Sequence, residues 1–101
     1  MERIHRPPDQ PSPTGPASSC AARILASAAT ELERAGTSRV ITRARLRCVI
    51  DDAAAAVLYR LPARALAQVA RRAWASIPYG IDGNTYGVQA RVLRGTARRL
   101  G

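Results

Sequence analysis

The chain has no lysine and no phenylalanine, and a single histidine and two cysteines stand among its 101 residues. The histidine, His5, lies in a proline-rich stretch, so the serines and cysteines elsewhere have no evident general base. Cys20 and Cys48 match no metal or redox spacing and are interpreted as small buried or half-buried residues. Nucleotide-binding and hydrolase fingerprints are also missing. We therefore expect no enzyme, no catalytic or metal site, no cofactor and no small-molecule substrate.

Long apolar runs are missing as well. The longest uncharged stretch after the N-terminal region is too short to span a bilayer, and residues 1–18 lack the apolar segment of an export signal. We expect a cytoplasmic protein without membrane association. Leu, Ile and Val together supply only 20 of 101 residues, and alanine makes up much of the hydrophobic 47%. Such a core is thin, so we expect a homodimer, or ordering on a polyanion, to stabilise it.

What the chain has in excess is arginine. The sequence contains 16 arginines against 7 carboxylates, which gives a net charge of +9. The first 36 residues are neutral, and residues 62–101 hold seven arginines against Asp82 alone. A GC-rich coding bias accounts for arginine in place of lysine, but it does not account for the excess over carboxylates. Such a charge raises the local concentration of phosphate-bearing molecules.

The N-terminal region differs in composition from the rest of the chain. Residues 1–18 hold five of the seven prolines, which predicts a disordered Pro-rich arm. Residues 19–101 then form one small basic domain. Its first helix is predicted over 19–35, capped by Ser18 or Ser19 and ended by Gly36.

The middle of the chain has one ambiguous and one clear segment. Residues 39–50 alternate like a strand, but the alanines that follow favour an extended piece at 39–41 and a helix over 43–60, capped by Thr42. Residues 63–76 separate apolar and cationic positions cleanly and predict the best helix in the chain. Its apolar face consists of Leu66, Val69, Ala70, Ala73 and Ile77, with Trp74 at the edge.

The C-terminal segment supports two interpretations. Asp82-Gly83 between apolar residues is a hairpin cue, which would pair residues 77–81 with 85–93. A helical stripe also runs through residues 86–99, although Gly87 and Gly95 each oppose a helix by about 1 kcal/mol relative to alanine. We favour the helix. The hairpin stays open as the alternative.

These elements predict a mainly α fold, a compact domain of three to four helices after the disordered arm. With the hairpin, the element order is similar to that of a winged helix. In that arrangement residues 63–76 would be the recognition helix and Asp82-Gly83-Asn84 would form the tip of the wing.

The charge pattern predicts a nucleic-acid-binding regulator or accessory factor, with duplex DNA as the favoured ligand. Arginine and glutamine both make bidentate contacts to base edges. Aromatic residues are few and are not interleaved with the arginines, which disfavours base stacking on single strands. The alternative is a protein-interaction module that applies its basic helices to an acidic partner or to a second copy. The predicted groove contacts are Arg64, Gln68, Arg71 and Arg72, and the predicted backbone contacts are Arg91, Arg94, Arg98 and Arg99.

Overall fold

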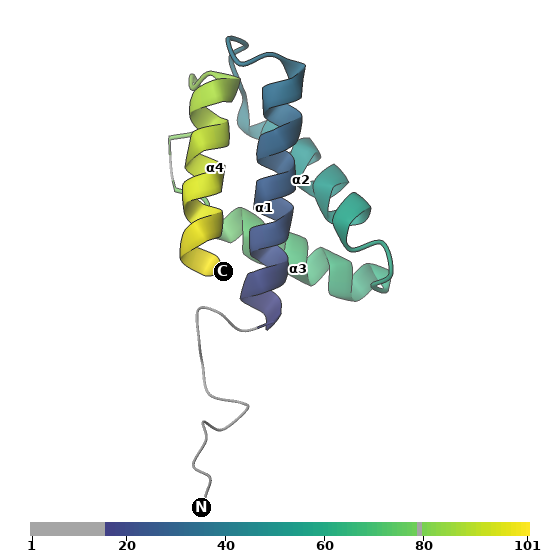
Figure 1. The fold of residues 1–101 in the computed structure, drawn as a ribbon. Helices are drawn as coiled ribbons and strands as arrows, with labels where there is room; N and C mark the ends of the chain where they lie inside the picture. The colour runs from purple at the N-terminus through teal and green to yellow at the C-terminus, as the bar shows by residue number, and fades with distance from the viewer. Residues whose placement is uncertain (1–15, 79) are drawn as a thin grey trace, which may run out of the picture.

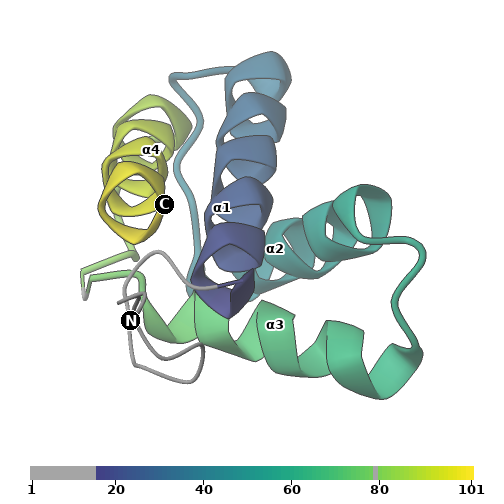
Figure 2. The same ribbon diagram turned by 60° about the horizontal axis from the view of Figure 1, so that its bottom comes forward.

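The chain is described by a computed structural model that covers residues 16–78 and 80–101. These residues form four helices, α1 (Pro16–Ala35), α2 (Arg43–Val57), α3 (Ala63–Ala75) and α4 (Tyr86–Leu100). The long helix α1 is central (Figure 1). Helix α4 lies antiparallel along one side of α1, whereas α2 and α3 cross its other side, as the turned view shows (Figure 2). The predicted mainly α domain is confirmed.

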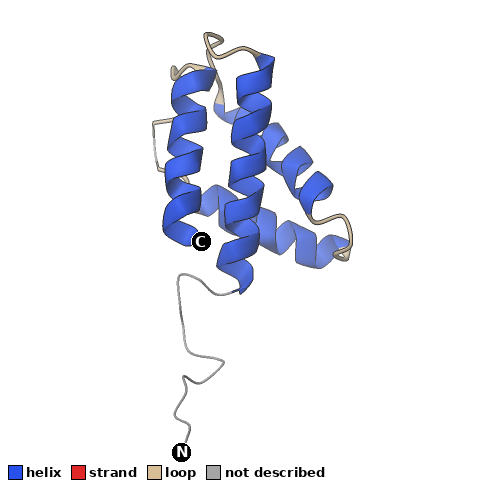
Figure 3. Ribbon diagram, viewed as in Figure 1, coloured by secondary structure: helices blue, strands red, loops and turns tan. Residues whose placement is uncertain are grey.

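The β-hairpin prediction is wrong. The described residues contain helices and loops but no hairpin (Figure 3), and the expected return strand is part of α4. Asp82 does lie in a turn, and Gly83 takes a positive φ of 93°. However, the Asp82 carboxylate accepts a hydrogen bond from the backbone N–H of Arg43 at 2.8 Å. The turn therefore caps the start of α2 instead of forming the tip of a wing.

An extended segment joins the starts of α2 and α4. Residues 37–41 run antiparallel to residues 83–87, with an isolated β-bridge between Val40 and Thr85. The Ile41 N–H donates to the Asn84 carbonyl at 2.8 Å, and the Tyr86 N–H donates to the Arg39 carbonyl at 2.6 Å. The extended piece predicted at 39–41 is present, and the segment leading into α4 is its partner.

Two of the predicted helix boundaries need correction, the start of α1 and the end of α2. Helix α1 begins at Pro16, so Ser18 lies buried inside it and is not its cap. The last three residues of the predicted disordered arm are thus helical, and residues 1–15 lie outside the described part. Gly36 ends α1 as predicted, with a φ of +123°. Helix α2 begins at the predicted residue, with Thr42 accepting from the Arg45 N–H at 3.2 Å, but ends at Val57.

The helices pack closely enough for few bulky side chains to form one continuous hydrophobic core. Bulky buried side chains come from every helix except α3, including Ile24, Leu32, Ile50 and Leu93. Alanines fill the gaps between them. A Cβ added at Gly87 would lie 3.1 Å from the Thr37 Cβ, so glycine is what lets α4 begin this close to the segment after α1.

The chain end of α4 returns to the beginning of α1. A Cβ on Gly101 would lie 3.0 Å from the Ala22 Cβ and 3.8 Å from the Ser19 Cα. Figure 1 shows the C-terminus at the same end of the molecule as the start of α1. Helix α4 therefore lies beside α1 along most of the length of α1.

Candidate nucleic-acid interface

Helix α3 packs on the core through one apolar face, where Leu66, Val69 and Trp74 surround two small buried side chains. Only Ala70 and Ala73 are buried among its residues, and larger apolar side chains such as Leu66 are half-buried. Its opposite face presents Arg64, Gln68 and Arg71, which are all exposed and which recur at helical spacing. Among the described residues, neither Arg64 nor Arg71 forms an ion pair. The cationic face of α3 is therefore open to a ligand.

Two arginines of α2 join this face through Trp74. The guanidinium of Arg43 lies 5.2 Å from the centre of the Trp74 ring, and that of Arg47 lies 5.3 Å from it. Cation–π contacts at this distance hold a guanidinium beside the ring. Arg47 also pairs with Asp51 one turn later in α2, at 3.7 Å. The α2 arginines are thus held next to α3.

A hollow between α2 and α3 links the two sets of side chains. It has a volume of about 350 Å³, and Arg47 and Asp51 line it from α2 while Ala67 and Arg71 line it from α3. We call the combined surface the α2–α3 basic face. It consists of Arg43, Arg47, Arg64, Gln68 and Arg71.

Sequence reasoning did not find Arg43 and Arg47. Their signal was a pair of arginines one turn apart in the first half of a predicted helix, which solvated helix faces show just as often. What identifies them is Trp74 on another helix. That proximity depends on how α2 and α3 pack, and no periodicity within either segment contains it.

Two of the predicted contact residues serve the fold. Arg72 donates to the buried Ser18 hydroxyl at 2.7 Å and so ties α3 to the start of α1. Arg94 forms a bidentate pair with Glu33, at 2.6 and 3.2 Å, and also donates to Thr30 at 3.1 Å. The hydrogen bonds from Arg94 lower the pKa of Glu33 below its ordinary value of 4.5, and they raise the pKa of Arg94 in turn.

The remaining predicted residues lie on α4, apart from α3. Arg91, Arg98 and Arg99 are exposed, and Arg99 donates to the Thr96 hydroxyl at 3.1 Å. Helix α3 packs on α1 and α2, whereas α4 packs on α1 alone. The eight predicted residues therefore do not form one cluster, and the α3 and α4 arginines belong to separate surfaces.

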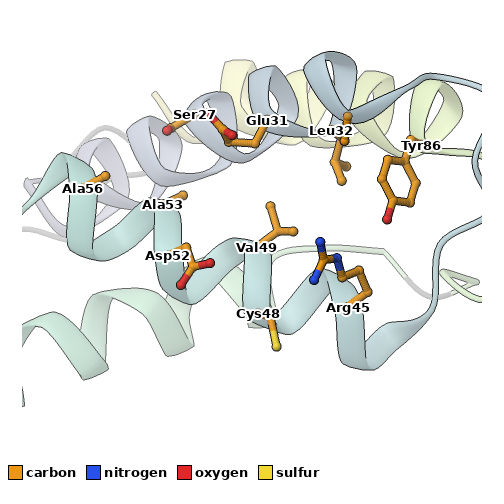
Figure 4. A pocket seen from close by; sticks show the side chains of 11 residues that line it. Ser27, Glu31, Leu32, Arg45, Cys48, Val49, Asp52, Ala53, Ala56 and Tyr86 are labelled. Atoms are coloured by element: carbon orange, nitrogen blue, oxygen red, sulfur yellow. The ribbon is translucent and has the colours of Figure 1, made fainter.

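Another hollow, between α1 and α2, is lined by charges of both signs (Figure 4). Its volume is about 300 Å³ and its apolar wall includes Leu32 and Val49. The Tyr86 hydroxyl and the Arg45 guanidinium point into the gap, while the exposed Cys48 sulfur points away from it. Cys48 is therefore not buried as predicted, whereas Cys20 is half-buried. Two carboxylates, Glu31 and Asp52, line this hollow against Arg45, whereas two arginines line the α2–α3 hollow against Asp51, so this hollow is a poorer match for a polyanion.

Among the described residues, no three His, Cys, Asp or Glu side chains gather in a way that could hold a metal ion. Within residues 16–78 and 80–101, every helix is too short or too polar to cross a membrane. Comparisons with protein-family models, curated proteins and solved structures find no match.

Proposed function

We propose that this protein binds duplex DNA through the α2–α3 basic face and acts as a small regulator or accessory factor. The observation that carries the proposal is the way α3 is held. Its apolar face packs on the core, so Arg64, Gln68 and Arg71 are left exposed on the opposite face. A helix about 10–12 Å wide fits a major groove of about 12 Å. Arginine and glutamine are side chains that read guanine and adenine in that groove.

The α2 arginines suit the DNA backbone. Arg43 and Arg47 stack on Trp74 at one end of α3, which restricts their movement before any ligand arrives. Phosphate contacts of this kind fix the orientation of a protein on the duplex without reading its sequence. Two carboxylates near these arginines would repel phosphate, but both are engaged: Asp82 at the N-terminus of α2, and Asp51 in its pair with Arg47 at 3.7 Å.

The same arrangement disfavours single strands. Unpaired bases bind proteins by stacking on accessible aromatic rings. Trp74 is half-buried with two guanidinium groups over its ring, and Tyr86 is buried. Tyr59 is 71% exposed but lies in the α2–α3 loop with Arg60 over its ring. Among residues 16–78 and 80–101, one exposed ring is too few for a stacking platform.

Fluorescence anisotropy tests the proposal directly. The chain is titrated against labelled duplex DNA, single-stranded RNA and heparin over a range of salt concentrations. We expect a preference for the duplex that persists at about 150 mM salt, with log K falling linearly against log salt concentration. Equal binding to all three ligands that disappears by that salt would mean that the net charge produces only generic polyelectrolyte attraction. That result would refute the proposal.

A pair of matched variants locates the surface. Replacing Arg64 and Arg71 with alanine should weaken duplex binding by about tenfold or more, since each charged contact contributes about 1–3 kcal/mol. The control replaces Arg23 and Arg34 on the neutral helix α1, which removes the same charge, and should change affinity by less than about twofold. Equal losses from both pairs would contradict the assignment of the α2–α3 basic face.

A second candidate function is the docking of an acidic protein partner. The α4 surface favours it, because arginines there flank an apolar hollow.

Self-association remains a prediction from the thin core. A thermal midpoint that rises with protein concentration would support a dimer, and a midpoint independent of concentration would contradict it.

A further inference from the structure

The outer side of α4 contains a hollow that the DNA-binding proposal does not use. Its volume is about 400 Å³, and it lies between α4 and the loop after α3. The apolar lining includes Val88, which is 44% exposed, and Val92, which is half-buried. Arg91 and Arg99 flank it, and no carboxylate is among its lining residues. The hollow is thus apolar inside and cationic at its edges.

The two glycines of α4 show that the fold does not require this hollow. Gly87 is needed, because a Cβ there would lie 3.1 and 3.2 Å from atoms of Thr37. Gly95 is different, since a Cβ there would meet nothing nearer than the guanidinium ends of Arg98 and Arg99, at 3.9 Å. A glycine inside a helix costs about 1 kcal/mol relative to alanine. Gly95 therefore has no packing reason to be glycine, and its missing side chain leaves the hollow open.

The arginines beside the hollow are available to a partner. Among the described residues, Arg91 and Arg99 form no ion pair, whereas the α4 arginine that does, Arg94, turns toward Glu33 on α1. Arg91 and Arg99 are eight residues apart, which is about 12 Å along a helix. Carboxylates two turns apart on a second helix would match that separation.

We propose that this hollow binds an acidic amphipathic segment of a partner protein. An apolar side chain of the partner enters between Val88 and Val92, and flanking carboxylates pair with Arg91 and Arg99. A nucleic-acid backbone fits the site less well, because its charged, hydrated phosphates alternate with small sugars and it has no long apolar side chain to enter between the valines. Helix-in-groove recognition uses this combination of an apolar anchor and charged flanks. The inference does not depend on DNA binding by the α2–α3 basic face.

Two synthetic peptides test the site on the full chain. The first is a fluorescein-labelled helical peptide in which two glutamates are seven or eight positions apart. Leucines stand between these glutamates on the same face of the helix. The second has the same charge with every leucine replaced by serine. At about 150 mM salt we expect the leucine peptide to bind at least tenfold more tightly than the serine peptide, because both carry the same charge and only leucine buries apolar surface in the hollow. Equal binding of the two peptides, or no binding of either, would overturn the proposal.

Gly95→Met separates the site from the fold. The methionine side chain fills the hollow and improves the helix propensity of α4, so the variant should be at least as stable as the parent chain. We expect a tenfold or greater loss of leucine-peptide affinity with unchanged binding of duplex DNA. The Arg64/Arg71 alanine variant should show the reverse. An unchanged peptide affinity in the folded Gly95→Met variant would overturn the proposal.

Discussion

The outer faces of α3 and α4 have similar compositions but different surroundings. Both helices carry arginine without any carboxylate of their own. On α3 the arginines extend from the face opposite the core contacts, and two further arginines are held beside them on Trp74. On α4 one arginine is bound to Glu33, and the hollow beside two others is lined by valines. The comparison shows that a count of cations does not define a binding surface, because neighbouring groups decide which ligand each arginine can reach.

Removing Trp74 should have the largest effect and should affect one surface alone. Trp74→Ala takes away a half-buried ring that contacts the core cluster, so we expect the free energy of unfolding to fall by about 2–3 kcal/mol. Arg43 and Arg47 lose their support, and duplex affinity should fall while affinity for the acidic peptide stays the same. Trp74→Phe keeps an aromatic ring and serves as the control. Urea denaturation and anisotropy measure the two effects, and full duplex affinity in folded Trp74→Ala would contradict the role given to the ring.

The two α4 glycines should respond to alanine in opposite directions. Gly87→Ala forces a Cβ against Thr37, and the cost of overpacking should exceed the helix gain and lower stability by about 1 kcal/mol. Gly95→Ala places its Cβ in open space and should raise stability by up to about 1 kcal/mol. Chemical denaturation of both variants provides the measurement. Stabilisation by both substitutions would mean that the approach of α4 to Thr37 is looser than the structure shows.

Removing the Asp82 cap should have a smaller effect, concentrated at the start of α2. Asp82→Ala leaves the Arg43 N–H without its side-chain acceptor, and loss of a helix cap costs about 1 kcal/mol. Asp82→Asn removes the same charge but keeps a capping oxygen. The difference between the two variants in a denaturation experiment therefore measures the cap, and identical stabilities would show that this hydrogen bond contributes nothing.

The Arg94–Glu33 pair should produce the smallest effect, because both side chains are well exposed to solvent. The folded-state pKa of Glu33 lies below 4.5, so the pair stabilises the protein above that pH and is lost as the pH falls through the lowered pKa. We expect Glu33→Gln to reduce the stability measured near neutral pH slightly and to flatten its dependence on acid. Parallel pH profiles for the parent chain and the variant would contradict this assignment.

The sequence predicted the helices better than the contacts between them. The periodicity of residues 63–76 identified α3 and its exposed face nearly to the residue, because one segment contains the whole signal. The hairpin cue at Asp82-Gly83 misled, since the same dipeptide can cap a distant helix as well as turn a strand. The glycine penalty in α4 also pointed the wrong way, because packing on α1 outweighs propensity. The site could be predicted only in part, since the contacts of Arg43, Arg72 and Arg94 join segments far apart in the chain.

Gly101 lies beside Ser19 and Ala22, so the two ends of the helical domain are close together in space. A short flexible linker from Gly101 back to Pro16 would span a small gap, and new ends could open in the exposed loop between α2 and α3, where Tyr59 lies. Such a circular permutant would have every helix of the original but would no longer have α2 and α3 joined in sequence. Whether the α2–α3 basic face then assembles depends on Trp74 and the core alone, so the permutant would separate the contribution of packing from that of the connecting loop.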